Sequence, residues 1–134
     1  MSAASDYLEN KLLDHVLKYS TASYTAPSTV YVALFTASTG LETNNPSAEI
    51  STSSTAYARQ SITFATASGG SSASNATVTF TAATSNWGTI THVAIMDAST
   101  SGNVLFYGAV TTSKTIETGD TFQISSGNLT ISLA

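Results

Sequence analysis

The residues of this chain that could perform acid–base chemistry are few, and their spacing brings no two of them together. His92 and Asp97 lie on one predicted strand an odd number of residues apart, so their side chains point to opposite faces and cannot form a His–Asp couple. His15 is isolated at the edge of a predicted helix, where a histidine is more often structural than a ligand. No G-x-S-x-G motif marks a serine nucleophile. We therefore predict no catalytic residue.

Metal and cofactor motifs are also missing from the sequence. The eight carboxylates are scattered singly, which gives neither the paired acids of a glycosidase nor a clustered calcium loop. The chain has no Cys, so thiolate metal sites and disulfides are excluded. Gly69 and Gly70 lack the lysine and the following helix of a phosphate-binding loop. The sequence predicts a protein that is not an enzyme and that holds no metal ion and no cofactor.

Residues 85–97 (SNWGTITHVAIMD) predict a turn followed by a central strand. Alternation along this strand puts one set of side chains on one face, namely Ile90, His92, Ala94 and Met96, and a second set on the other, namely Thr91, Val93, Ile95 and Asp97. Both sets contain bulky apolar residues, which favours a strand covered on both faces. Trp87, at the mouth of the strand, is interpreted as a cap of the core with a bonded indole N–H rather than as a ligand-stacking platform.

The composition is that of a chain that folds and has an unusually neutral surface. Hydrophobic residues make up 42% of the 134 residues and charged residues only 9%, while Ser and Thr fill 45 positions. With four cations and a net charge of −4, no basic patch is available for nucleic acid. No window is apolar enough to span a membrane, and the N-terminus lacks the features of a signal peptide. We expect a single domain over residues 1–134, with neither nucleic acid nor membrane as a partner.

One amphipathic helix is predicted over residues 6–19. Asp6 as the N-cap, with Glu9 three residues later, forms a variant of the capping box. Apolar side chains cover about half of the helix circumference, so one face is expected to pack on the rest of the fold through Leu8, Leu12 and Val16.

Short strands are predicted over residues 29–36, 57–64, 75–82, 89–97, 104–110, 114–117, 121–124 and 128–133. About eight strands separated by turn signals predict an all-β fold, an antiparallel and jelly-roll-like β-sandwich with the helix packed on it. The core residues that we predict are Leu8, Leu12, Val16, Val32, Leu34, Trp87, Val93, Ile95, Phe106 and Ile131.

Two long polar loops are predicted, over residues 37–56 and 65–74. A loop of twenty residues in a compact domain is usually functional, disordered or a reaching arm. We expect the first loop and the N-terminal residues 2–6 to touch a partner, and deletion of residues 42–53 to leave the fold intact. The predicted partner contacts are Ser2, Ser5, Glu42, Asn44, Asn45 and Glu49.

Most of the chain resembles a family of small structural proteins of tailed phages. The matching stretches, in the family's order, are YLENKLLDHVL, TVYVALFTA, YARQSITF, NWGTITHVAIMDA, GNVLFYGAV and KTIETGDTFQISSGNLTISL. Members are often labelled tail-fibre proteins, and some that resemble it are capsid cement subunits with a jelly-roll-like sandwich arranged in trimers. The resemblance implies a component of the virion, made in the host cytoplasm.

Three functions are compatible with this resemblance. A fibre usually needs a shaft of repeats or a coiled coil, and the sequence shows neither. Our first prediction is therefore a decoration protein on the capsid surface, which binds the major capsid protein and forms a homotrimer. The alternative is a tail or tail-fibre-tip subunit involved in host attachment. The third is a carbohydrate-binding module, which only Trp87 and the tyrosines favour.

Overall fold

A five-stranded antiparallel sheet is the centre of the computed structural model, which describes residues 2–18 and 24–133. In spatial order its strands are β1 (Ala3–Ala4), β7 (Val104–Ile116), β6 (Gly88–Met96), β2 (Val30–Phe35) and β3 (Gln60–Ile62). Two short antiparallel pairs stand apart from it: β4 (Ser71–Ala73) with β9 (Thr130–Ser132), and β5 (Val78–Thr79) with β8 (Gln123–Ile124). The one helix of the described residues, α1 (Asp6–Leu17), follows β1.

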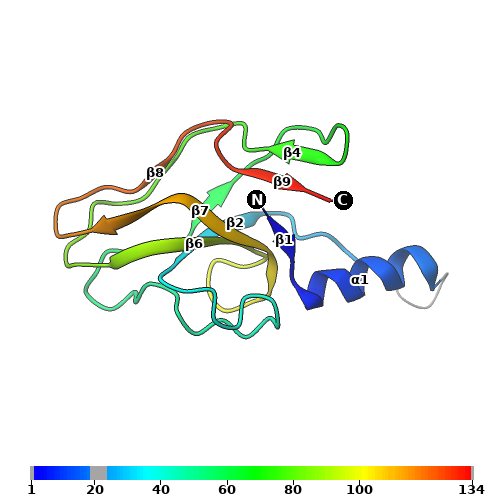
Figure 1. The fold of residues 1–134 in the computed structure, drawn as a ribbon, viewed down its shortest axis with the longest axis horizontal. Helices are drawn as coiled ribbons and strands as arrows, with labels where there is room; N and C mark the ends of the chain where they lie inside the picture. The colour runs from blue at the N-terminus through cyan, green and yellow to red at the C-terminus, as the bar shows by residue number, and fades with distance from the viewer. Residues whose placement is uncertain (1, 19–23, 134) are drawn as a thin grey trace.

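The β4–β9 pair and β8 lie on one side of the sheet, with β6 and β7 opposite them (Figure 1). The space between the two layers holds the larger apolar cluster. Leu34 of β2 and Ile95 of β6 contribute from the sheet, and Val78, Phe80 and Phe122 contribute from the facing layer. This arrangement confirms the antiparallel, sandwich-like all-β fold that the sequence predicts.

A second apolar cluster lies on the opposite face of the sheet. It contains Ala33 and Phe35 of β2, Ala94 and Met96 of β6, and also Leu41, which comes from the loop after β2. Because neighbouring residues of a strand point to opposite faces, β2 buries one set of side chains in each cluster. The prediction that the central strands are covered on both faces is confirmed.

The alternation predicted for β6 breaks near its start. Ile90 was expected on the face of Ala94 and Met96, but it joins Val93 and Ile95 in the interlayer cluster. The reason is an irregularity in pairing: Ile90 is opposite Lys114, whereas His92 is opposite Ala109, so extra residues of β7 are accommodated between them. A bulge of this kind changes the face to which the following side chains point.

The strands also differ from the predicted ones in number and length. Residues 104–110 and 114–117 were predicted as separate strands, but both lie in the continuous β7, because the bulge interrupts the pattern without ending the pairing. Residues 65–74 were predicted as a loop, yet they contain β4. The Ser-rich segment pairs with β9 through its backbone, which composition does not reveal.

The helix begins as predicted but is capped by a different residue. Ser5, not Asp6, is the N-cap, and its hydroxyl accepts a hydrogen bond from the backbone N–H of Leu8. Asp6 and Glu9 instead lie in the first turn, where carboxylates favour the positive end of the helix. The described helix ends at Leu17, and Tyr19, its predicted end, lies outside the described residues.

Only the first half of α1 packs on the sheet. Leu8 is buried and Leu12 is half-buried against the interlayer cluster. Val16 is 73% exposed, so its assignment to the core is wrong: beyond Leu12 the helix extends away from the strands (Figure 1). The other predicted core residues are buried (Val32, Leu34, Trp87, Val93, Ile95) or half-buried against the cluster (Phe106, Ile131).

The burial of α1 predicts which of its residues matter for stability. Leu8→Ala should lower the free energy of unfolding by about 3 kcal/mol, because it leaves a cavity in the interlayer cluster. Asn10→Ala, an exposed position on the same helix, is the matched control and should change it by less than about 0.5 kcal/mol. Urea denaturation followed by circular dichroism measures both. Equal effects would mean that the helix is not anchored through Leu8.

Candidate functional site

Among the residues that the structure describes, neither histidine is bonded to an acidic side chain. His15 accepts a hydrogen bond from the backbone N–H of Tyr24 at 3.1 Å, and His92 is bonded to the hydroxyl of Thr91 at 2.8 Å. Among the described residues, no group of three His, Asp or Glu side chains is placed to hold a metal ion. No helix in the described part of the chain is long and apolar enough to cross a membrane.

The N-terminal residues predicted to touch a partner are bound within the fold. Ser5 is fully buried, its N–H donates to Leu105 O at 2.9 Å, and its hydroxyl donates to Val104 O. Ser5 is therefore not the exposed partner contact that the sequence suggested. Its hydroxyl caps α1, and its hydroxyl and N–H bond to backbone carbonyls of β7. Ser2 is half-buried, and its hydroxyl accepts a hydrogen bond from the backbone N–H of Ser132 at 3.1 Å.

The loop of residues 37–56 is folded onto the sheet rather than extended from it. Gly40 makes a tight turn at φ +77°, where a Cβ atom would overlap the backbone of Asn45. Asn44, at φ 58°, accepts from the N–H of Val104 at 2.7 Å and donates to Asn103 at 2.9 Å. The turn places the side chain of Leu41 in the second apolar cluster. The loop therefore serves as the cover of that face.

A bidentate ion pair closes the other end of this loop. The Glu49 carboxylate accepts from Arg59 Nε at 2.7 Å and from Arg59 Nη2 at 2.8 Å. Arg59 Nη1 donates to the carbonyls of Ala98 and Ser101, at 2.8 and 2.7 Å, in the connection between β6 and β7. The Arg59 side chain is only 6% exposed and that of Glu49 is 25% exposed. Glu49 is thus engaged inside the fold, although it was predicted as a partner contact.

Tyr57 joins this ion pair to the central sheet. Its hydroxyl accepts from the backbone N–H of Leu34 at 3.0 Å and donates to Glu49 at 2.9 Å. Burial raises the pKa of the Tyr57 hydroxyl above its ordinary value, and the negative charge of Glu49 raises it further. The neutral form is therefore the one that the folded state holds.

Trp87 has the structural role expected for it. It is 5% exposed, and its indole N–H donates to Thr55 O at 2.8 Å. Its ring packs edge-to-face on Tyr57 and Phe80, with centroids 5.5 and 6.3 Å apart. A ring enclosed in this way is not a platform for stacking a ligand.

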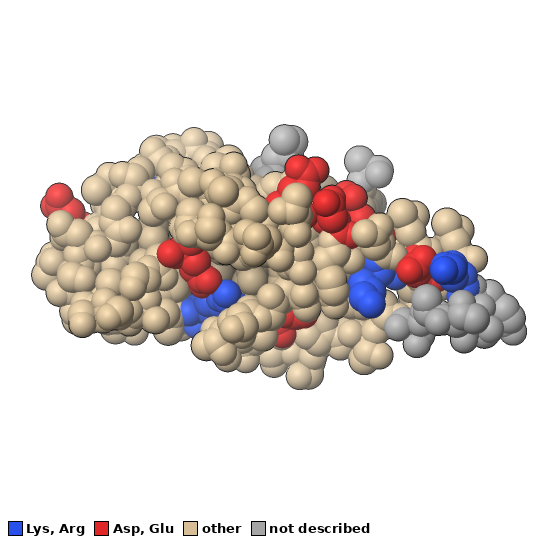
Figure 2. Space-filling view, turned by 90° about the horizontal axis from the view of Figure 1, so that it is seen from below, with Lys and Arg blue, Asp and Glu red and all other residues tan. Residues whose placement is uncertain are grey.

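Glu42 and Asn45 are the predicted loop contacts that remain exposed. The structure argues against the expectation that residues 42–53 can be deleted without loss of the fold, because they include Ile50, which is 5% exposed in the interlayer cluster, as well as Asn44 and Glu49. The face seen in Figure 2 carries its charges in small separate groups on a largely uncharged surface. Recognition on such a surface depends on shape and apolar contact more than on charge.

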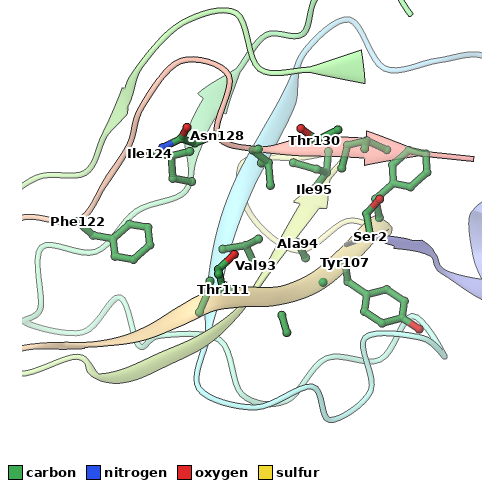
Figure 3. Close-up of a pocket in the computed structure, with 16 residues that line it drawn as sticks. Ser2, Val93, Ala94, Ile95, Tyr107, Thr111, Phe122, Ile124, Asn128 and Thr130 are labelled. Carbon is green, nitrogen blue, oxygen red and sulfur yellow. The ribbon is translucent and has the colours of Figure 1, made fainter. Parts of the chain in front are cut away.

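Two openings lead into the space between the layers. The first, which we call the interlayer groove, has a volume of about 290 Å³; Figure 3 shows Ile124, Asn128 and Thr130 across it from Val93 and Thr111. The second, which we call the apolar hollow, has a volume of about 320 Å³ and no charged residue in its wall. The hollow is lined by Val30, Phe64, Ala67, Gly70, Ser71, Ser72, Ile95, Leu105, Phe106, Ile131 and Leu133.

These features define a small antiparallel β protein with a largely uncharged surface (Figure 2) and an apolar hollow beside its interlayer cluster. Residues 3–132 match the family model described as podophage GP4 fiber I protein gp80. The chain belongs to this family and is a phage structural protein, which confirms the resemblance noted in its sequence. No curated protein matches the chain.

The ion pair predicts a large loss of stability from a single substitution. Arg59→Ala should lower the free energy of unfolding by about 3 kcal/mol, because it removes the ion-pair partner of Glu49 and the donor to the carbonyls of Ala98 and Ser101. Glu42→Gln is the matched control, since it neutralises an exposed carboxylate of the same loop and should change stability by less than about 0.5 kcal/mol. Urea denaturation measures the difference. A loss for Glu42→Gln as large as that for Arg59→Ala would contradict this assignment.

The raised pKa of Tyr57 predicts a decline of stability in alkaline solution. Above about pH 10 the unfolded chain loses the tyrosine proton that the folded chain retains, so unfolding becomes more favourable as the pH rises. The pKa values of Tyr24 and Tyr107 are also raised, by burial first, and contribute in the same direction. Tyr57→Phe should therefore reduce this decline without abolishing it. Denaturation midpoints between about pH 8 and about pH 11 test this, and an unchanged slope in the variant would refute it.

Proposed function

We propose that this protein is a subunit of a fibre on the virion of a tailed phage, where it binds other virion proteins and takes part in host attachment. The observation that carries the proposal is the match of residues 3–132 to a family described as a podophage fibre protein. The match extends over the helix and all the strands, so the whole described fold belongs to the proposed role.

The surface of the protein supports a role in assembly. Few charges are available, and the partly buried pair of Arg59 and Glu49 is used within the fold. Contacts with neighbours must then be made mainly by hydroxyl groups and by exposed apolar side chains, of which the second half of α1 is the largest group. We further propose that the protein forms a homotrimer, since several linked copies multiply the strength of weak individual contacts.

Capsid decoration, with the major capsid protein as partner, is the second candidate. It is favoured by the shape of the fold: the described residues contain a single helix of 12 residues and no repeated unit from which a fibre shaft could be built. In this alternative the same exposed surfaces would bind the outside of the head.

We also propose that the protein acts without catalysis and without binding a sugar through its tryptophan. The histidines bond to a backbone N–H and to a threonine, and the Trp87 ring is packed against Tyr57 and Phe80. Both features support a structural function, as does the family to which the chain belongs.

The number of copies per virion separates the two candidates. A fibre subunit should be present in a small number of copies, whereas a decoration protein should be present in numbers comparable to those of the major capsid protein. Quantitative mass spectrometry of purified virions, with separated heads and tails as the matched samples, measures this ratio. Enrichment in tails supports the fibre proposal, and hundreds of copies on heads would overturn it in favour of decoration.

A further inference from the structure

The exposed apolar surface of this protein is concentrated at two places. Among the described residues, the large apolar side chains that remain exposed are Leu13 (57%), Val16 (73%), Leu17 (72%) and Leu133 (56%). Leu13, Val16 and Leu17 belong to α1, and Leu133 forms part of the wall of the apolar hollow. One place is convex and the other is concave.

The helical part of this surface continues the face of α1 that is already buried. Leu8 and Leu12 pack on the sheet. The same apolar half of the helix also contains Leu13, Val16 and Leu17, which none of the described strands covers (Figure 1). A helix of 12 residues is marginal in water unless tertiary contacts support it. The second half of α1 is therefore suited to being covered by another protein surface.

The hollow offers the matching chemistry. Phe64, Leu105, Phe106, Ile131 and Leu133 supply apolar walls around a volume of about 320 Å³, and no charged residue lines it. On the helix, Lys11 and Asp14 lie opposite the apolar stripe. An amphipathic helix whose apolar face lies in a groove is a common mode of recognition. Glu9, one turn before Leu13 on the same face, would lie at the edge of this contact, and Leu13, Val16 and Leu17 would form its centre.

The helix of a given chain is directed away from the hollow of that chain. Ser5 and β1 fix the start of α1 to β7 beside Leu105 and Phe106, which line the hollow, and from there α1 leaves the β4–β9 pair (Figure 1). The exposed half of α1 and the apolar hollow lie at the same end of the molecule. Within one chain they cannot meet unless the bonds of Ser5 and β1 to β7 are broken. They are free to meet between two copies.

The area required for a stable contact favours a second copy over an unrelated partner. A single short helix in a groove buries less than the roughly 800 Å² per partner of a stable interface. A partner that offered only a groove would make this contact once. A second copy offers both surfaces, so that in a closed assembly each copy is engaged twice, through its helix and through its hollow.

We propose that copies of this protein assemble head-to-tail, with Leu13, Val16 and Leu17 of one copy seated in the apolar hollow of the next. The contact joins two different surfaces, so successive copies form a ring when the rotation between them closes, and the homotrimer proposed above is the ring that we propose. The inference rests on the proposed function only in assuming that the protein works as an oligomer. The assembly should depend only weakly on salt, because apolar side chains form the centre of the contact.

The first experiment compares charge insertions at matched positions of the full chain. Leu17→Glu on the helix and Leu133→Glu at the hollow should each raise the dissociation constant of the oligomer at least about 100-fold, because each would bury an unpaired carboxylate. Lys11→Glu places the same carboxylate on α1 opposite the stripe and should leave association unchanged. Analytical ultracentrifugation over a dilution series measures association, and circular dichroism confirms that each variant is folded.

The second experiment tests which surfaces meet. Leu17→Glu retains an intact hollow and Leu133→Glu an intact helix, so an equimolar mixture of the two should form one-to-one pairs and no ring. Since the chain has no Cys, a variant carrying both Val16→Cys and Leu133→Cys should also give covalent rings with a short bismaleimide, whereas each single cysteine variant should not.

Three outcomes would overturn the inference. The first is a wild-type chain that stays monomeric at every concentration, which would mean that the two surfaces face another virion protein. The second is an oligomer that survives both glutamate substitutions. The third is an oligomer lost with Leu17→Glu but kept with Leu133→Glu, as expected for helix-to-helix packing. None of these depends on where the protein lies in the virion, so they are distinct from failure of the proposed function.

Discussion

The ion pair between Arg59 and Glu49 is the interaction on which the arrangement of the loops depends. It joins the loop of residues 37–56, the chain leading into β3 and the connection between β6 and β7, and Tyr57 links it to the backbone of β2. A buried pair adds little stability over apolar packing, but the loss of one partner is costly. Such a pair therefore specifies one arrangement of three polar segments that have few apolar side chains of their own.

Other charged side chains of this chain also form bonds inside the fold instead of remaining free on the surface. Asp97 accepts from the backbone and side chain of Asn103, and Asp120 accepts from the N–H of Glu117, so these carboxylates also hold turns. In a chain with 8 acidic and 4 basic residues, few are left to act at long range. The outer surface is then shaped by hydroxyl groups and by the apolar residues that the core does not absorb.

The sequence predicts well those features that depend on a local pattern. Alternation in β2 and the aromatic character of Trp87 identified buried positions, because a strand side chain has only two directions available. The pattern fails where a contact from a distant segment decides the outcome. Ser5 was read as a surface residue because its type is polar, but Val104 and Leu105 bury it. Val16 was read as core because the helix is amphipathic, although periodicity alone does not state how far a partner surface extends.

The loop of residues 37–56 is a further case in which the sequence pattern did not predict the packing. Its composition is that of a flexible arm, and only Leu41 and Ile50 are strongly apolar within residues 37–56. Those two side chains are buried in different clusters, on the two faces of the sheet, so a pair of apolar residues and a few polar bonds suffice to fix the whole loop. The loop thus covers the sheet, while the helix, which was expected to be a cover, leaves half of its apolar face exposed. The exposed half of the helix is the surface to which we assign the contact between copies, since exposed apolar patches of this kind commonly mark sites of interaction.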